Sequence, residues 1–226
     1  KIELEKYFTD PLIAGRLKTY GDITLLTRKI GDDYTRASGG LNWSKSVIAP
    51  GGVEVQPFAE ARADYIELEP DGGTKTDFSR TLGQVGVDIR YPFINSTKDV
   101  DFIIEPRAQI TQKFGDGKIE NFDSNNDGEL DLIQDSLDVD LDQALLWTPN
   151  KSTGYDFWQK GFRADVGASF VADWDKTRAH LFLGKSFASD IDNEFSNTSG
   201  LRGKSSDVVG LFELDLNGKL VSTTRL

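Results

Sequence analysis

The chain has 226 residues, a formal net charge of -11 and neither cysteine nor methionine. The lack of cysteine excludes a disulfide framework, cysteine-based zinc sites and thiol catalysis within this stretch, and the acidic charge argues against nucleic acid as a partner. No run approaches the roughly 18 apolar residues of a membrane-spanning helix. A membrane-spanning β-strand escapes that criterion, because only every second side chain faces lipid.

Alternation of polar and apolar residues begins at the first residues of the chain, without a charged-then-apolar leader before it. It predicts weaker strands at 2–8 and 16–28 and a clear strand at 35–43. The chain also stops within an alternating run, at 218–226. We therefore expect an internal piece of a longer protein.

The strongest alternation continues through the rest of the chain. It predicts strands at Val53–Leu68, Leu82–Tyr91, Val100–Thr111, Phe162–Trp174, Arg178–Phe187 and Asp207–Leu216, and a weaker one at Lys219–Leu226. We expect about ten antiparallel strands. Several have ten or more residues, whereas soluble strands usually have about five or six and a tilted strand needs about 9–11 to cross a bilayer.

Charged residues of both signs occupy one face of these strands. They are Glu60, Arg62, Asp64, Asp88, Arg90, Glu105, Arg107, Arg163 and Asp165. Mixed charges in mid-strand are typical of a wet barrel interior, so we expect these side chains to face the lumen. The apolar face often ends in an aromatic residue (Trp43, Tyr65, Tyr91, Trp174), as in the interfacial girdle of membrane barrels.

The pattern favours an all-β fold, an incomplete antiparallel transmembrane β-barrel whose two end strands stay unpaired. A soluble sandwich or lipocalin-like barrel with one dry face also explains alternation and is the alternative. Residues 1–226 form part of one barrel domain, with a long outward loop at about 115–159 and a second polar segment at 189–205. Long outer loops are ordinary in membrane barrels and unusual in compact soluble domains.

One loop motif suggests a metal. Asp123, Asn125, Asp127 and Asp131 match positions one, three, five and nine of a calcium loop, with glycine at position six. Gln134 stands at position twelve, where such a loop has a bidentate glutamate. Structural calcium is thus one interpretation and a solvated acidic loop the other; no other cofactor is expected.

The sequence offers little for catalysis, and we expect no enzyme. His180 is the single histidine and shares a face with Arg178 and Phe182. No nucleophile elbow is present. Glu60 and Asp64 would suit a glycosidase if they flanked a cleft, but ion pairs in a lumen explain them equally; a soluble carbohydrate-active enzyme is therefore a further alternative class.

A series of segments resembles the lipopolysaccharide (LPS)-assembly protein family LptD, also called OstA. The segments are Gln56–Tyr65, Arg90–Ile94, Ile104–Ile110, Gln134–Ser136, Leu145–Trp147, Gly154–Asp156, Gly161–Asp165, Leu183–Phe187, Ser199–Leu201 and Ser205–Gly210. No single motif is specific; their common order and spacing carry the resemblance. Gln134 and Asp135 depart from the family's Asn-Glu.

The resemblance implies the central part of an outer-membrane barrel that assembles LPS into the outer leaflet of a Gram-negative cell envelope. It implies three partners: LPS, an LptE-type lipoprotein plug, and periplasmic Lpt bridge proteins that reach a domain outside this chain. The family's gate residues match no position here. The alternative function is a passive porin or substrate-specific outer-membrane channel.

The charge of -11 does not attract the phosphates of LPS. Divalent cations at acidic outer loops would bridge to those phosphates, or these strands only scaffold the lumen. The second interpretation is the one we favour.

Overall fold

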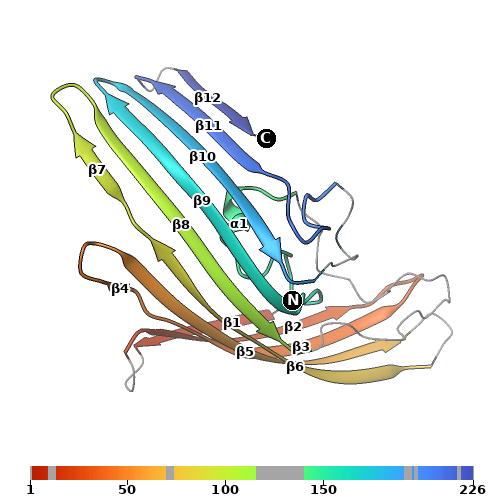
Figure 1. The fold of residues 1–226 in the computed structure, drawn as a ribbon. Coiled ribbons are helices and arrows are strands. Elements are labelled where there is room, and N and C mark those ends of the chain that lie inside the picture. Colours follow the sequence, from red (N-terminus) through yellow and green to blue (C-terminus); the bar gives the residue numbers. More distant parts are fainter. Residues whose placement is uncertain are drawn as a thin grey trace.

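The computed structural model describes residues 2–9, 14–69, 74–115, 140–190, 195, 198–217 and 220–225. Within these ranges 12 strands form one antiparallel sheet, and α1 (Gln143–Leu146) is the only helix (Figure 1). The strands are β1 (Ile2–Thr9), β2 (Arg16–Leu26), β3 (Asp33–Ser44), β4 (Val47–Ile48), β5 (Glu54–Glu69), β6 (Thr76–Arg90), β7 (Phe93–Ser96), β8 (Asp101–Phe114), β9 (Gly161–Trp174), β10 (Thr177–Ala188), β11 (Val209–Leu216) and β12 (Leu220–Arg225).

The strand order follows the sequence. The path β1-β2-β3-β5-β6-β8-β9-β10-β11-β12 contains ten strands, as the alternation predicted, with β4 pairing to β5 and β7 to β8. Among the described residues the sheet does not close, since β1 and β12 lie at its two edges. The predicted all-β, incomplete-barrel fold is confirmed. The sandwich alternative is wrong, because a sandwich needs two packed sheets.

The two faces of the sheet reverse the pattern of a soluble protein, which buries apolar and exposes charged side chains. The face that we call the outer face exposes large apolar residues: Ile23, Leu25, Leu41, Val85, Ile89, Phe102, Ile104, Ile110, Phe162, Val166, Phe170, Leu181, Leu183 and Phe212. The opposite face, the inner face, buries charged residues: Asp22, Arg36, Arg62, Asp64, Arg80, Asp88, Lys113, Arg163 and Asp165. Val85 is 48% exposed and Arg36 0%.

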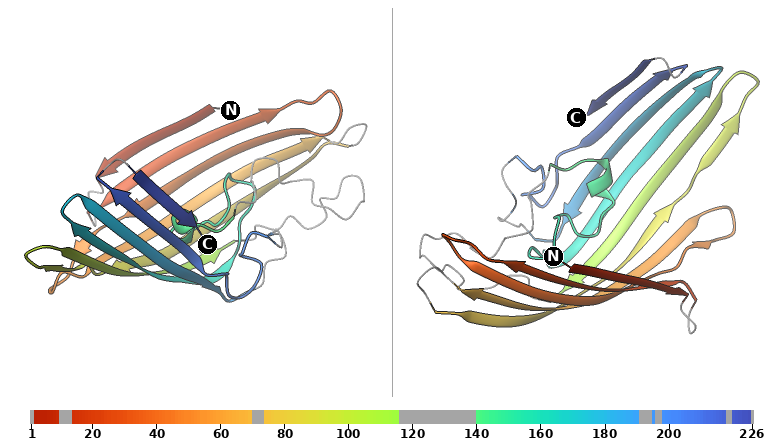
Figure 2. Two further views of the ribbon diagram at one scale, coloured as in Figure 1. Left: turned by 90° about the horizontal axis from the view of Figure 1, so that it is seen from above. Right: turned by 180° about the vertical axis from the view of Figure 1, so that it is seen from behind.

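The pairing between β6 and β8 is offset and sets two halves of the sheet at an angle. β6 pairs with β8 only from Gly83 to Arg90, whereas it pairs with β5 from Thr76 onward. Beyond the end of β6, β7 takes the place beside the first residues of β8. Figures 1 and 2 show the resulting trough, with β1–β6 as one wall and β8–β12 as the other.

Two differences from the predicted elements have physical causes. β6 starts at Thr76 rather than Leu82, because its first residues pair in register with the end of β5, Thr76 opposite Leu68. The prediction missed this start because most of these residues are polar and show no alternation. The short strands β4 and β7 escaped prediction, since two to four residues are too few to show a period.

The described end of the long loop lies on the inner side of the sheet. Residues 140–160, including α1, run through the trough between the two walls (Figure 2). The middle of the predicted outward loop lies outside the described residues, and so does the calcium motif at Asp123, Asn125, Asp127 and Asp131.

Candidate functional site: the charged inner face and its inner segment

The inner face holds a stretch of the loop, residues 147–160, which we call the inner segment. Asp156 of this segment accepts a hydrogen bond from the Tyr34 hydroxyl and lies 2.6 Å from Nη1 of Arg36. Nη2 of Arg36 reaches Asp22 on β2 at 2.7 Å. The side chains of all three charged residues are at most 1% exposed. A buried guanidinium thus lies between two carboxylates that come from different elements.

A second group of ion pairs joins β5 and β6 to the same segment. Asp64 lies 2.7 Å from Nε of Arg80 and 3.1 Å from Nε of Arg62. Both arginines also donate to the carbonyl of Tyr155, and Arg80 donates to the carbonyl of Asp156 at 2.8 Å. The two arginines therefore share one strand carboxylate, and both satisfy backbone acceptors of the loop.

The next strands repeat this arrangement. Arg107 on β8 pairs with Asp88 on β6 at 2.8 Å, and its guanidinium carbon lies 4.4 Å from the centre of the Trp147 ring. Gln109 donates to Asp88 and to the carbonyl of Trp147, each at 3.1 Å. On β5, Glu60 accepts from the Tyr20 hydroxyl and from the amide of Gln84.

Lys151 anchors the inner segment to β9. Its Nζ lies 2.9 Å from Asp165 and donates to the carbonyls of Leu145 and Leu146. Burial lowers the pKa of Lys151 to about 8, against the attraction of Asp165, which acts in the opposite direction. Arg163 on the same strand donates to Gln159 and to the hydroxyl of Ser186.

Aromatic rings of the inner segment lie against cations of the strands. The guanidinium carbons of Arg36 and Arg62 lie 4.8 and 5.1 Å from the centre of the Tyr155 ring. Nζ of Lys113 lies 4.1 Å from the centre of the Trp158 ring. These cation–π contacts add to the ion pairs, because a desolvated cation gains more from a ring face than an exposed one.

Leu146 and Trp147, at the C-terminal end of α1, pack over a pair of glycines. Gly167 on β9 and Gly184 on β10 are register partners on the inner face. A Cβ at Gly184 would lie 2.3 Å from Cδ2 of Leu146, and one at Gly167 would lie 3.1 Å from Cζ2 of Trp147. The two missing side chains leave the hollow in which Leu146 and Trp147 pack, beside Phe182 and Val209.

Residues 198–208 add a second layer next to the inner segment. Ser206 exchanges hydrogen bonds with Ser186 on β10, which fixes this loop to the sheet. Phe195 and Leu201 pack with Phe157 in a small apolar cluster. The inner side is therefore filled by two loops that use both charged and apolar contacts.

Seven of the nine predicted inner-face residues take part in these contacts: Glu60, Arg62, Asp64, Asp88, Arg107, Arg163 and Asp165. Arg90 pairs with Glu54 at 2.9 Å, away from the inner segment. Glu105 has no ion pair or hydrogen bond with the residues that the structure describes. That these side chains line an aqueous lumen stays a prediction.

Sequence reasoning missed the residues that bind the inner segment from the first strands and from the segment itself: Asp22, Tyr34, Arg36, Arg80, Lys113, Lys151 and Asp156. Arg36 lay within a predicted strand, and its face was readable from the period. Asp156 and Lys151 lie in a stretch without alternation, where no local pattern marks them.

Titratable groups near the inner face are used for ion pairs and hydrogen bonds in the residues that the structure describes. Nδ1 of His180 lies 3.2 Å from Glu213, on the inner face of β10 and β11, without a nucleophile beside it in the described residues. In the part of the chain that the structure describes, no three His, Cys, Asp or Glu residues are placed to hold a metal ion.

Comparison with known proteins agrees with this geometry. No helix among the described residues is long and apolar enough to cross a membrane. No curated protein matches the chain. The family model described as LPS transport system D, LptD, matches residues 5–226, nearly the whole chain. The chain therefore belongs to the LptD family of LPS transport and assembly proteins, which are proteins of the outer membrane.

Proposed function

We propose that this chain forms part of the wall of the translocon that receives LPS from periplasmic Lpt bridge proteins and delivers it to the outer leaflet. The outer face contacts membrane lipid, and the inner face borders the passage together with an LptE-type lipoprotein plug. The bridge proteins act through a domain outside this chain. The observation that carries the proposal is the reversed burial of the sheet, with Val85, Phe162 and Val166 exposed and Arg36, Asp64 and Asp165 buried.

The LptD family match favours translocation over passive diffusion. A porin-type channel would also be expected to have a constriction loop on its inner side, so the inner segment alone does not separate the two. The inner segment is fixed to β3, β5, β6, β8 and β9 by charged and polar side chains, so it narrows the space beside the inner face. A porin-type pore of this kind needs a free aqueous path. In planar bilayers we expect the full-length protein with its plug to conduct few ions.

The ion pairs also show that the charge of -11 is not concentrated at the buried inner-face carboxylates. The buried aspartates of the inner face are paired with arginine or lysine, as Asp64 is with Arg80 and Asp165 with Lys151. They are thus structural, in line with strands that scaffold the lumen rather than attract phosphate. Calcium at Asp123, Asn125, Asp127 and Asp131 is a separate proposal, tested by calorimetric titration of calcium into the protein; no heat at millimolar calcium would contradict it.

Photo-crosslinking in cells tests the proposed passage. A photoreactive residue replaces Ser169, on the inner face of β9, or Val166, on the outer face of the same strand, in the full-length protein. We expect LPS adducts at Ser169 only while transport from the inner membrane is energised. Adducts that form equally with and without energised transport, or a high ion conductance, would support the channel alternative instead.

A further inference from the structure

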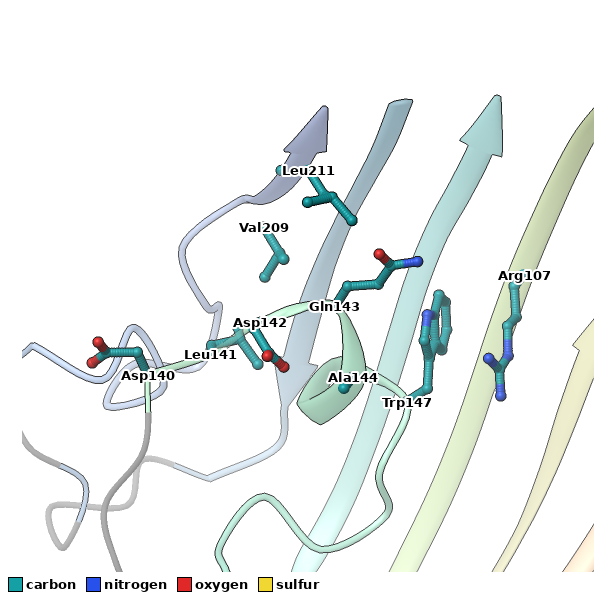
Figure 3. A pocket seen from close by; sticks show the side chains of 10 residues that line it. Arg107, Asp140, Leu141, Asp142, Gln143, Ala144, Trp147, Val209 and Leu211 are labelled. Atoms are coloured by element: carbon teal, nitrogen blue, oxygen red, sulfur yellow. The ribbon is translucent and has the colours of Figure 1, made fainter. Parts of the chain in front are cut away.

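A pocket of about 790 Å³ lies between α1 and the inner face of the sheet (Figure 3). Gln143, Ala144 and Trp147 line it on the side of the helix, and Arg107 and Leu211 line it on the side of the strands. Its volume falls within the roughly 300–1,000 Å³ of small-molecule sites. Figure 3 shows these side chains around one space.

Several polar groups at this pocket have no partner among the described residues. The side-chain amide of Gln143 and the carboxylate of Asp140 make no hydrogen bond there. Asp142 uses Oδ1 to accept from the amide of Leu145, which leaves Oδ2. Nε and Nη2 of Arg107 contact the carboxylate of Asp88, and Nη1 of Arg107 is available to donate to a ligand. The pocket therefore offers both donors and acceptors at its rim.

Apolar side chains form the rest of the lining. Leu141, Val209 and Leu211 also line the pocket, and the Trp147 ring packs against Phe182 in a T-shaped contact. A ligand that fits must present apolar C–H groups and hydroxyl groups close together. Sugar rings have this character, whereas acyl chains would leave the amide and carboxylates desolvated without partners.

The charge of the lining narrows the choice of sugar. Asp140 and Asp142 contribute two carboxylates, and Arg107, the one cation among the described lining residues, is already paired with Asp88 at 2.8 Å. The local field is negative, so a sugar carrying phosphate or carboxylate would be repelled. Uncharged hexoses meet no such penalty.

We propose that this pocket is a subsite for uncharged sugar units of the saccharide that passes along the inner face. The proposal rests on the proposed function, because that function supplies a saccharide to this side of the sheet. Gln143, Asp142 and Nη1 of Arg107 bind hydroxyl groups, and Leu141 and Val209 contact the C–H faces of the ring.

The test uses the full-length protein with its plug in detergent. The probe is the lipid-free saccharide released from the host's LPS, before and after enzymatic removal of phosphate, and its affinity is measured by calorimetry. Ala144→Trp fills the pocket, and it removes no hydrogen bond because the methyl group of Ala144 makes none. Asn42→Trp is the matched control, since Asn42 shares the inner face with Arg36 on β3, outside this pocket. Gln143→Ala removes only the unpaired amide.

We expect Ala144→Trp to weaken binding of the dephosphorylated saccharide by at least roughly tenfold, and Gln143→Ala by a few-fold, with Asn42→Trp unchanged. Equal affinity in Ala144→Trp and Asn42→Trp, or tighter binding of the phosphorylated probe, overturns the subsite. If no variant changes binding while LPS adducts still form at Ser169, the subsite is wrong and the proposed function stands. If no LPS adducts form at Ser169 when the photoreactive residue is placed there and the pocket is unaltered, the result counts against the proposed function itself.

Discussion

Arg36 shows how a residue that is unfavourable in a protein core becomes part of this one. Its guanidinium is 0% exposed and lies between Asp22 and Asp156. Burying such a charge is costly, and the cost is offset only while both carboxylates and the Tyr34 hydroxyl are in place. The contact between the inner segment and the strands therefore depends on individual charged side chains. Removing one of them should weaken this contact strongly.

Arg36→Met tests this dependence. The substitution removes the guanidinium that pairs with both Asp22 and Asp156, so we expect a loss of about 3–5 kcal/mol in stability. The control is Arg178→Met, because Arg178 lies 3.7 Å from Asp173 with side chains 59% and 38% exposed, and such a pair contributes about 0–1 kcal/mol. Samples of both variants are heated to a series of temperatures and then run on a gel. The temperature at which the band of folded protein disappears measures the stability of each variant. Equal shifts for the two variants would contradict the prediction.

Lys151 gives a pH-dependent prediction. Its pKa is about 8 in the folded protein, below the 10.5 of a free lysine, because burial disfavours the charged form. Between these two values the unfolded chain binds more protons than the folded one, so stability rises with pH. We expect the unmodified protein to gain stability relative to Lys151→Met from about pH 8 to pH 10.5, and the gap to stay constant below pH 7. Thermal unfolding across this range measures the difference; a loss of stability of the unmodified protein relative to Lys151→Met with rising pH would contradict the assignment.

At the scale of elements, the glycine pair on β9 and β10 determines where α1 packs. Gly184→Val places a side chain where Leu146 lies, 2.3 Å from the position of the new Cβ. We expect a loss of about 1–3 kcal/mol from overpacking, together with faster proteolysis within the inner segment. Limited proteolysis and unfolding temperature measure the two effects.

Another glycine pair provides the control. Gly21 and Gly39 are register partners on β2 and β3, and a Cβ at Gly39 would meet only the carbonyl of Tyr20, at 3.9 Å. Gly39→Val should therefore be tolerated or slightly stabilising, since a β-branched residue favours a strand. Equal damage from Gly39→Val and Gly184→Val would mean that the hollow for Leu146 has no special role.

The strands were predictable because alternation is a local signal. The run Phe162–Trp174 differs from β9 by one residue, and the inner and outer faces follow from the same period. The inner segment was not predictable in this way. Asp156 lies 120 positions from Arg36 in the sequence, and nothing in a single local pattern specifies a contact over that distance.

The same limit applies to the candidate site. The sequence identified Arg62, Asp64 and Asp165 as residues of one face, and the structure places them there. It did not identify their partners, because Tyr155 binds through its carbonyl, which any residue type provides, and Lys151 lies outside every alternating run. The period of a strand predicts on which face of the sheet a side chain lies. Its contact partner depends on the path of the loop over that face.

At the scale of the whole molecule, the sheet is arranged for two different surroundings. Its outer face exposes residues such as Val85 and Phe170, and its inner face buries ion pairs beneath loops. The offset between β6 and β8 turns one wall against the other, so the inner segment touches strands from both. Both the reversed burial and the trough are needed if the outer face is to meet lipid while the inner face remains polar.

A depth-dependent cost along β9 tests whether this outer face meets lipid. Val166 lies near the middle of the strand and Trp174 at its end, both on the outer face and 42% and 38% exposed. If lipid covers this face, Val166→Arg places a charge near the bilayer centre and costs about 2–4 kcal/mol, whereas Trp174→Arg lies near the interface and costs about 0–1 kcal/mol from the charge. If water covered it, the two charges would be equally tolerated, and Trp174→Arg would be the more harmful change because it removes a large aromatic side chain. The amount of folded protein in the outer membrane, measured for both variants and for Val166→Ala, therefore separates the two surroundings by the order of the effects.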